Sequence, residues 1–159
     1  MKPRVYVETS ILSYLTALPS RDLVQTAHQQ LTVEWWGRRD RFDLFVSEAV
    51  LAEVRKGDPA AAARRVGATE GLRVLSATHD AQALAAALLK AAVMPEKAAI
   101  DAADVAIATV HGLEFLLTWN CTHIANATMR PRIEAVCRES GFQPPIICTP
   151  EELTLQEGT

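Results

Sequence analysis

The chain has 159 residues, a hydrophobic fraction of 49%, a charged fraction of 22% and a formal net charge of −3. This composition is typical of a globular protein and excludes the disordered, fibrous and low-complexity classes. The slightly acidic balance gives no overall attraction to polyanions, so a contact with nucleic acid would depend on local basic clusters or on metal ions. The length fits one domain, and we expect residues 1–159 to form it.

The sequence predicts no export signal and no membrane segment. The N-terminal stretch MKPRVYVETS has basic residues but no apolar core of signal-peptide length, and the longest apolar stretch, 83–94, is interrupted by Lys90. The cysteines are odd in number and lack CxxC spacing, which favours reduced thiols over a disulfide framework. We therefore expect a cytoplasmic protein that makes no contact with membranes.

Five short runs of β-forming residues are predicted to be strands. The first, 5–7, has no polar alternation, which is typical of a strand that is buried on both faces of a parallel sheet. The others are 42–47, the weaker 72–75, 115–118 and 146–148. Helical spacing of apolar residues predicts a helix that Thr9 and Ser10 cap. Further helices are expected over 21–39, 48–56, 60–66, 81–93, 97–111 and 132–139.

The predicted strands and helices alternate along the chain without hairpin signals. Parallel neighbours need long crossover connections, which are usually helices. We therefore predict an α/β fold, a three-layer α/β/α sandwich around a mostly parallel central sheet.

An acid, Glu8, directly follows the first predicted strand. In open parallel sheets the functional crevice lies outside the carboxyl ends of the strands, so a polar residue at this place is informative. Glu53 lies in the helix after the second strand, and Asp101 lies in the first turns of the helix that precedes the predicted strand 115–118. Asn120 follows that strand. If the three strands are neighbours, these four oxygen-bearing side chains converge at one edge of the sheet.

Clustered carboxylates repel one another at low dielectric, so such a group is stable when it is protonated or when it shares a cation. Mg²⁺ or Mn²⁺ is the fitting ion, because both prefer oxygen ligands. The alternative for any single acid is a solvated helix cap or a surface charge.

Four segments that contain these polar residues form a series of motifs over nearly the whole chain, from residue 5 to about residue 150. They are VYVETSILSYL with Glu8, VSEAVLAEV with Ser47 and Glu53, DAADVAIATVHG beginning at Asp101, and LLTWNCTHIAN around Thr118 and Asn120. In this order and at these separations, they resemble the motifs of the PIN-domain ribonucleases, and in particular of the VapC-type toxins of bacterial toxin-antitoxin pairs.

This resemblance implies a metal-dependent endonuclease that cuts single-stranded or structured RNA. It also implies a homodimer and a small antitoxin that blocks the acidic site. The chain departs from the family at two positions, because Glu8 stands where most members have Asp, as in an "ETS" branch, and Asn120 replaces an acid found in some members. The second change would weaken a second metal site, so one-metal and two-metal chemistry both stay open. The other alternative is a catalytically inactive PIN-like module that binds RNA or protein.

The predicted metal ligands and catalytic groups are Glu8, Glu53 and Asp101, with Mg²⁺ or Mn²⁺ activating a water for attack on the scissile phosphate. The secondary candidates for the site are Asp104, Asn120, Thr9, Ser47 and Thr118. Asp104 lies on the helix face next to Asp101, but the motif matches Asp101. Glu48 competes with Glu53, although an acid in the first turn also stabilises a helix through its dipole.

Basic and aromatic residues give weaker indications of partners. Arg38 and Arg39 belong to the densest basic cluster and are candidates for RNA phosphate contacts, with a solvated face as the alternative. For the adjacent Trp35 and Trp36, we expect one side chain in the core and one in an apolar surface that faces a partner.

The spacing of Cys121 and His123 is that of a C-x-H pair. A zinc site requires a second ligand pair at finger-like spacing, and the sequence has none. The other histidines are predicted to have ordinary packing or surface roles.

Overall fold

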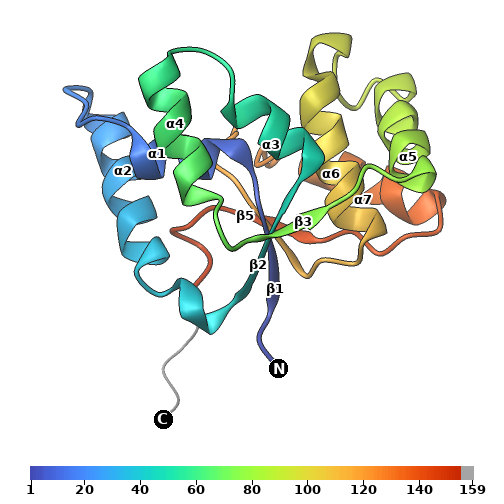
Figure 1. Ribbon diagram of the computed structural model, residues 1–159. Coiled ribbons are helices and arrows are strands. Elements are labelled where there is room, and N and C mark those ends of the chain that lie inside the picture. Colours follow the sequence, from blue (N-terminus) through green and yellow to red (C-terminus); the bar gives the residue numbers. More distant parts are fainter. Residues whose placement is uncertain (155–159) are drawn as a thin grey trace.

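The computed structural model describes residues 1–154 and contains one five-stranded parallel sheet in the order β3-β2-β1-β4-β5 (Figure 1). The strands are β1 (Arg4–Val7), β2 (Asp43–Ser47), β3 (Arg73–Leu75), β4 (Phe115–Leu117) and β5 (Ile146–Cys148). Every pairing between neighbouring strands is parallel. The predicted α/β class is confirmed.

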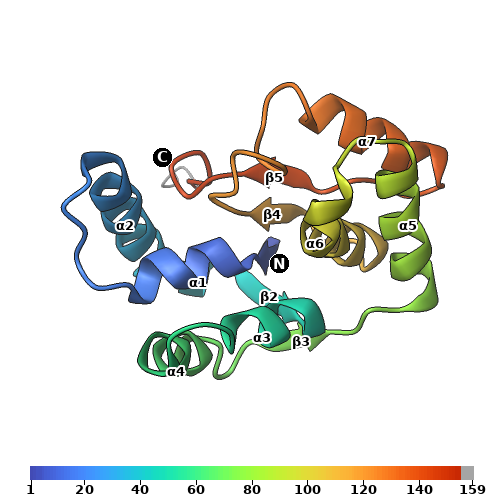
Figure 2. The same cartoon turned by 90° about the horizontal axis from the view of Figure 1, so that it is seen from above.

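Helices cover both faces of this sheet, as Figure 2 shows from above. One face carries α1 (Thr9–Thr16), α2 (Leu23–Trp36) and α4 (Pro59–Ala68). The other carries α5 (His79–Lys90), α6 (Ala99–Val110) and α7 (Arg130–Glu139). The short helix α3 (Glu48–Val54) follows β2 directly and packs against α1, α4 and α6. This arrangement is the predicted three-layer sandwich.

The order of the strands creates a switch point between β1 and β4. Helices α1 and α2 lead from β1 to β2 on one face, whereas α7 leads from β4 to β5 on the other. In open parallel sheets, ligands bind in the crevice outside the carboxyl ends of the strands at such a point. Glu8 and Thr118 directly follow these two strands.

The central strand β1 is held by apolar burial. Val5, Tyr6 and Val7 are fully buried, as the absence of polar alternation predicts. Each fully buried aliphatic side chain of this size contributes about 1.5–3 kcal/mol relative to exposure. The edge strand β3 leaves Val74 half exposed, which explains its weak sequence signal.

Several helices begin or end at other residues than predicted, because side-chain caps and 3-10 turns set their limits. Helix α2 begins after Asp22, whose carboxylate accepts a hydrogen bond from the backbone N–H of Gln25 at 2.9 Å. It is followed by a separate 3-10 turn, Arg39–Arg41. Helix α5 begins after Thr78, whose hydroxyl accepts from the N–H of Ala81 at 3.2 Å. Another 3-10 turn, Glu96–Ala98, precedes α6, and both α4 and α7 have a proline in their first turn.

All three cysteines are free thiols, as predicted, with Cys121 exposed and Cys137 and Cys148 buried. No helix within residues 1–154 is both long and apolar enough to cross a membrane. The domain predicted over residues 1–159 includes 155–159, which lie outside the described residues.

Candidate functional site

Glu8 caps helix α1 with its own side chain. Oε2 accepts from the backbone N–H of Ser10 at 3.0 Å, and Oε1 accepts from the hydroxyls of Ser10, at 2.6 Å, and of Thr118. The prediction that Thr9 and Ser10 cap this helix is wrong, since the carboxylate of the preceding residue, Glu8, accepts from the N–H of Ser10 in the first turn. The Glu8 side chain is 3% exposed and joins the ends of β1 and β4.

The environment of Glu8 opposes its ionisation in two ways. Burial raises the pKa of Glu8, and the charge of Glu53 raises it further. The hydrogen bonds from Ser10 and Thr118 lower this pKa, because they stabilise the ionised form. Glu8 is therefore a desolvated carboxyl group that is fixed by three donors.

Glu53 and Asp101 belong to the same group of interacting charges. Glu53 lies on α3 and is half-buried, and burial raises its pKa. The charge of Asp101, on α6, raises the pKa of Glu53 further, whereas Lys56 and the Thr9 hydroxyl lower it. The fold thus brings the predicted acids close enough to influence one another, although they come from three distant segments.

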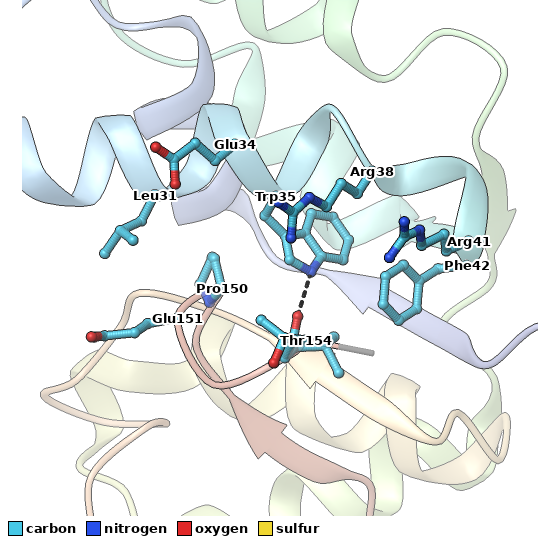
Figure 3. A pocket seen from close by; sticks show the side chains of 10 residues that line it. Leu31, Glu34, Trp35, Arg38, Arg41, Phe42, Pro150, Glu151 and Thr154 are labelled. Carbon is cyan, nitrogen blue, oxygen red and sulfur yellow. Dashed lines mark hydrogen bonds between the residues drawn. The ribbon is translucent and has the colours of Figure 1, made fainter. Parts of the chain in front are cut away.

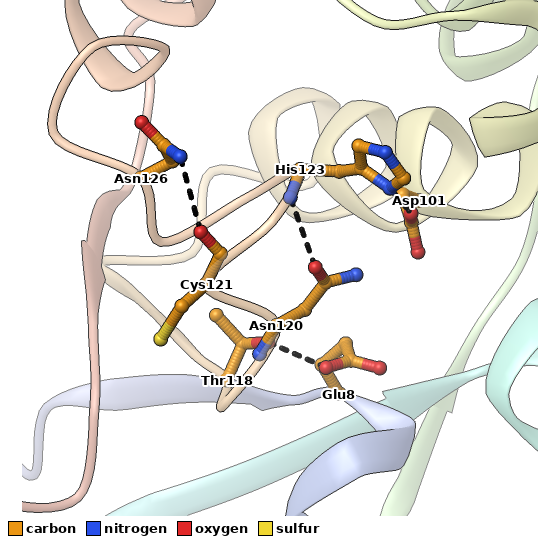
Figure 4. A network of polar contacts seen from close by, with 7 residues as sticks. All are labelled: Glu8, Asp101, Thr118, Asn120, Cys121, His123 and Asn126. Carbon is orange, nitrogen blue, oxygen red and sulfur yellow. Dashed lines mark hydrogen bonds and ion pairs between the residues drawn. The ribbon is translucent and has the colours of Figure 1, made fainter.

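Asp101 contacts a residue that the sequence did not single out for this site. Its Oδ2 lies 2.9 Å from Nδ1 of His123, and the two side chains are 19% and 21% exposed. The backbone N–H of His123 donates to Oδ1 of Asn120 at 3.0 Å (Figure 4). The sequence places His123 in the polar WNCTHIAN segment, three residues after Asn120 and at C-x-H spacing from Cys121, and neither feature indicates a contact with Asp101.

Asp104 lies beneath the other acids in a buried polar network. The phenol of Tyr6 donates to Oδ1 of Asp104 at 2.5 Å, and the Tyr6 oxygen is 2.7 Å from Oγ of Ser47. Ser47 also caps α3, since its Oγ accepts from the N–H of Val50 at 3.2 Å. Burial, and then the charge of Glu8, raise the pKa of Asp104 well above its usual range. Asp104 and Ser47 are therefore buried groups that are joined through Tyr6 and lie in the core next to the site.

Thr118, Trp119 and Asn120 directly follow β4 and form another side of the site. The Thr118 hydroxyl, which donates to Glu8, also accepts from the N–H of Asn120 at 2.9 Å. The Trp119 ring stacks on His28 at 3.9 Å, and its N–H donates to the hydroxyl of Thr32 at 2.7 Å. These contacts fix the segment against the α1–α2 pair.

The donor set fits a hard divalent cation in its chemistry, because carboxylate and amide oxygens are the ligands that Mg²⁺ and Mn²⁺ prefer. The mutual effects of the acids on their pKa values also fit, since a shared cation offsets such repulsion. Within residues 1–154, no three His, Cys, Asp or Glu side chains are grouped closely enough to hold a metal ion as they stand. A cation held by Glu8, Glu53 and Asp101 therefore requires rearrangement of their side chains.

The structure does not bring Arg38 and Arg39 to the acids. Both precede β2, and the starts of parallel strands lie at the opposite edge of the sheet from Glu8. The Arg39 guanidinium lies 5.1 Å from the centre of the Trp36 ring and donates to the carbonyl oxygen of Trp36 at 2.9 Å. Glu48, the alternative to Glu53 as the second acid of the site, accepts a hydrogen bond from the N–H of Ala77 at 3.2 Å.

Of the adjacent tryptophans, Trp35 lies in the core, as the sequence predicted for one of the two. Trp35 is 5% exposed, packs against Phe42, and donates from its ring N–H to the carbonyl of Leu153 at 3.0 Å. It lines a pocket of about 110 Å³ beside Arg38 (Figure 3). Trp36 is half-buried against the core. The large exposed apolar side chains near α2 are instead Leu18, Leu23, Val24 and Val33.

Solved structures that share this fold include the following two. One is VapC20 of Mycobacterium tuberculosis, described as a toxin that cleaves the sarcin-ricin loop, with a TM-score of 0.58, 18% identity, and 87% of this chain and 95% of that chain covered. The other is VapBC2 from Rickettsia felis bound to a DNA fragment from their promoter, with a TM-score of 0.55, 12% identity, and 92% and 98% covered. The sequence matches no family model and no curated protein. The resemblance to VapC toxins is therefore confirmed at the level of the fold.

Proposed function

We propose that this protein is a metal-dependent endoribonuclease and the toxin of a toxin-antitoxin pair. The observation that carries the proposal is the convergence of three acids from distant segments, since Glu8 follows β1 at the switch point, the charge of Glu53 acts on Glu8, and the charge of Asp101 acts on Glu53. Acids that are held this close together repel one another unless a cation or a proton offsets the repulsion. The fold shared with VapC20, which is described as a sarcin-ricin loop cleaving toxin, supports RNA as the proposed substrate class.

The proposed cofactor is Mg²⁺, with Mn²⁺ as a substitute. Glu8, Glu53 and Asp101 would hold it through carboxylate oxygens, and Asn120 would orient a water or an outer ligand. When bound, the ion would neutralise charge on the phosphate and activate water as a nucleophile.

The protein's own residues would prepare the site for this chemistry. The hydrogen bonds from Ser10 and Thr118 hold Glu8 in one orientation, and its burial excludes bulk water from one side of the site. A shallow hollow of about 270 Å³ between α3 and α6 is lined by Glu53, Lys56 and Ile100, among others. We propose that an RNA strand enters here, where the Lys56 ammonium is available for a phosphate.

The proposed protein partners are an antitoxin and a second copy of the chain. The complex of Rickettsia felis, which has the same fold, supports the antitoxin. The exposed apolar side chains of Leu18, Leu23, Val24 and Val33 offer a surface that a partner would cover. Size-exclusion chromatography with light scattering tests the homodimer, and a monomer at all micromolar concentrations would remove it.

Two measurements test the enzymatic proposal. Calorimetric titration with MgCl₂ and with MnCl₂ should show binding at the acids, and a mixed RNA pool should be cleaved in the presence of either ion and not with a chelator. If neither binding nor cleavage occurs, the enzyme proposal fails. The protein would then be a module of the same fold that only binds RNA or protein.

A further inference from the structure

The contact between Asp101 and His123 joins two segments that are distant in the sequence. Asp101 stands in the first turn of α6, and His123 belongs to the segment that follows β4. Their side chains meet at 2.9 Å, between Oδ2 and Nδ1. Because an ionised carboxylate only accepts hydrogen bonds, we assign Nδ1 as the donor.

His123 is itself held in place by a chain of hydrogen bonds that begins at Glu8. Thr118 donates to Glu8 and accepts from the N–H of Asn120, and the Asn120 amide oxygen accepts from the N–H of His123. As Figure 4 shows, this series runs from Glu8 to Asp101 along one side of the site. It connects two of the three proposed ligands through groups that are not ligands.

The backbone around His123 is anchored on both sides. The carbonyl oxygen of Asn120 accepts from the N–H of Ile124 at 3.2 Å and of Ala125 at 2.7 Å. Ile124 is fully buried and Ala125 is 7% exposed, so apolar packing fixes the turn. A side chain on such a turn can orient its neighbour, because its own position is set by the fold.

We infer that His123 is a positioning residue that holds the Asp101 carboxylate in the orientation in which it binds the divalent ion. This inference rests on the proposed function and deepens it. His123 occupies Oδ2 and restricts rotation of the short side chain, so Oδ1 is the oxygen that stays available for the ion. Hydrogen-bond partners of metal-binding carboxylates commonly act in this way, and losing one costs about ten- to a hundredfold in metal affinity or activity.

Three substitutions of His123 separate positioning from packing. His123→Asn keeps a donor nitrogen at the same distance from the backbone as Nδ1, so it should retain Mn²⁺ affinity and cleavage close to the parental values. His123→Leu keeps bulk without a donor, and His123→Gln places its donor one bond too far. Both should weaken Mn²⁺ binding in calorimetry by about ten- to a hundredfold. In RNA cleavage, kcat at a fixed ion concentration should fall by a similar factor, with KM for RNA little changed.

A double-substitution cycle with Asp101→Asn adds a readout that a packing role would not affect. On the Asp101→Asn background, His123→Leu should cause little further loss of Mn²⁺ affinity, because the carboxylate ligand that His123 orients is then absent. The matched control is His79→Leu, at an exposed position on α5, which should leave Mn²⁺ affinity and the melting temperature as in the parent. Melting curves of the ion-free variants confirm that each one folds, and His123→Gln serves if His123→Leu does not.

The outcomes distinguish this inference from the function on which it rests. If the parent binds Mn²⁺ and cleaves RNA while His123→Leu and His123→Gln do both equally well, the positioning role is wrong and the enzyme stands. The positioning role is also wrong if His123→Asn loses as much affinity as His123→Leu, or if the losses are additive in the double variant. If the parent binds neither Mn²⁺ nor Mg²⁺ and cleaves no RNA, the proposed function fails, and the role of His123 fails with it.

Discussion

The phenol of Tyr6 donates a hydrogen bond of 2.5 Å to Oδ1 of Asp104, inside the core beneath Glu8. Asp104 is 1% exposed, and its Oδ2 has no hydrogen-bond partner within residues 1–154. One neutral donor offsets only part of the cost of burying a charge, and the charge of Glu8 adds repulsion. The native fold therefore favours the protonated form of Asp104.

Asp104→Asn should make the ion-free protein more stable at pH 8 and flatten the pH dependence of its stability. A pKa that is raised in the native state gives stability that is complete below the unfolded value and is lost as the pH rises through the native value. The amide keeps an oxygen acceptor for Tyr6 but carries no charge to bury. We expect a gain on the order of 1 kcal/mol at pH 8 and little change at pH 4.

Urea unfolding at pH 4, 6 and 8 measures this effect, with Glu70→Gln as a control that neutralises an exposed acid. Burial also raises the pKa values of Glu8 and Glu53, so part of the pH dependence should persist in Asp104→Asn. A loss of stability at pH 8 would show that the charge of Asp104 is favourable in the native state, contrary to this interpretation.

The sequence predicted the position of the site because that position follows from strand order. Short apolar runs that alternate with helical segments indicate parallel strands joined by helices. Residues that directly follow parallel strands lie at the same edge of the sheet. Glu8 and Thr118 satisfy this rule directly, since each comes immediately after a strand. Glu53 and Asp101 lie within helices, so predicting them as site residues also required the resemblance to VapC motifs.

The contacts between these residues could not be predicted, because they depend on side-chain reach and burial. Nothing in the sequence distinguishes an acid that caps its own helix, as Glu8 does, from one that leaves capping to the next residue. The polar end of Tyr6 meets Asp104 only because β1 and α6 pack together at that depth. The sequence also did not show which of Trp35 and Trp36 enters the core, nor that exposed Arg39 lies over the Trp36 ring, since both depend on how α2 packs.

Trp119→Phe should lower the free energy of unfolding by about 1 kcal/mol, the usual contribution of one hydrogen bond. The phenyl ring preserves the stack on His28 but removes the N–H that donates to Thr32. Trp119→Ala removes both contacts and should cost about 3–5 kcal/mol. Urea unfolding measures both changes. Thr32→Val removes this hydrogen bond together with the one from its hydroxyl to the His28 carbonyl, so the losses in the double variant should be less than additive, and full additivity would contradict this assignment.

Cys121 should be the thiol that iodoacetamide modifies in the native protein. The thiolate is the reactive form, and Cys121 is exposed. Burial raises the pKa of the Cys137 thiol, and burial with the charge of Glu152 raises that of Cys148 to about 12. Mass spectrometry should find one adduct on native protein at pH 8, none on Cys121→Ser, and three on the unfolded parent. Rapid modification of native Cys121→Ser would contradict the burial of the other two thiols.

Asp101→Asn should reduce RNA cleavage by about a hundredfold or more, the scale on which a single catalytic group contributes. The melting temperature of the ion-free protein should not fall, because the amide oxygen still accepts from His123 and the charge that repels Glu53 is gone. A structural ion pair would behave in the opposite way, with stability lost together with the charge. Cleavage at the parental rate in Mg²⁺ would remove Asp101 from the catalytic group.

Glu8→Asp tests whether the length of the first acid is essential, since the family pattern has Asp more often at this position. Asp is a good N-cap, so helix α1 should keep its first hydrogen bond and the fold should lose about 1 kcal/mol or less. The shorter side chain should no longer reach the Thr118 hydroxyl, which now donates to Oε1. We expect cleavage to fall but to stay above that of Glu8→Gln, because a carboxylate for the ion survives in the first variant and not in the second. Cleavage and melting curves of both variants decide this, and equal activity of Glu8→Gln and the parent would limit Glu8 to capping the helix.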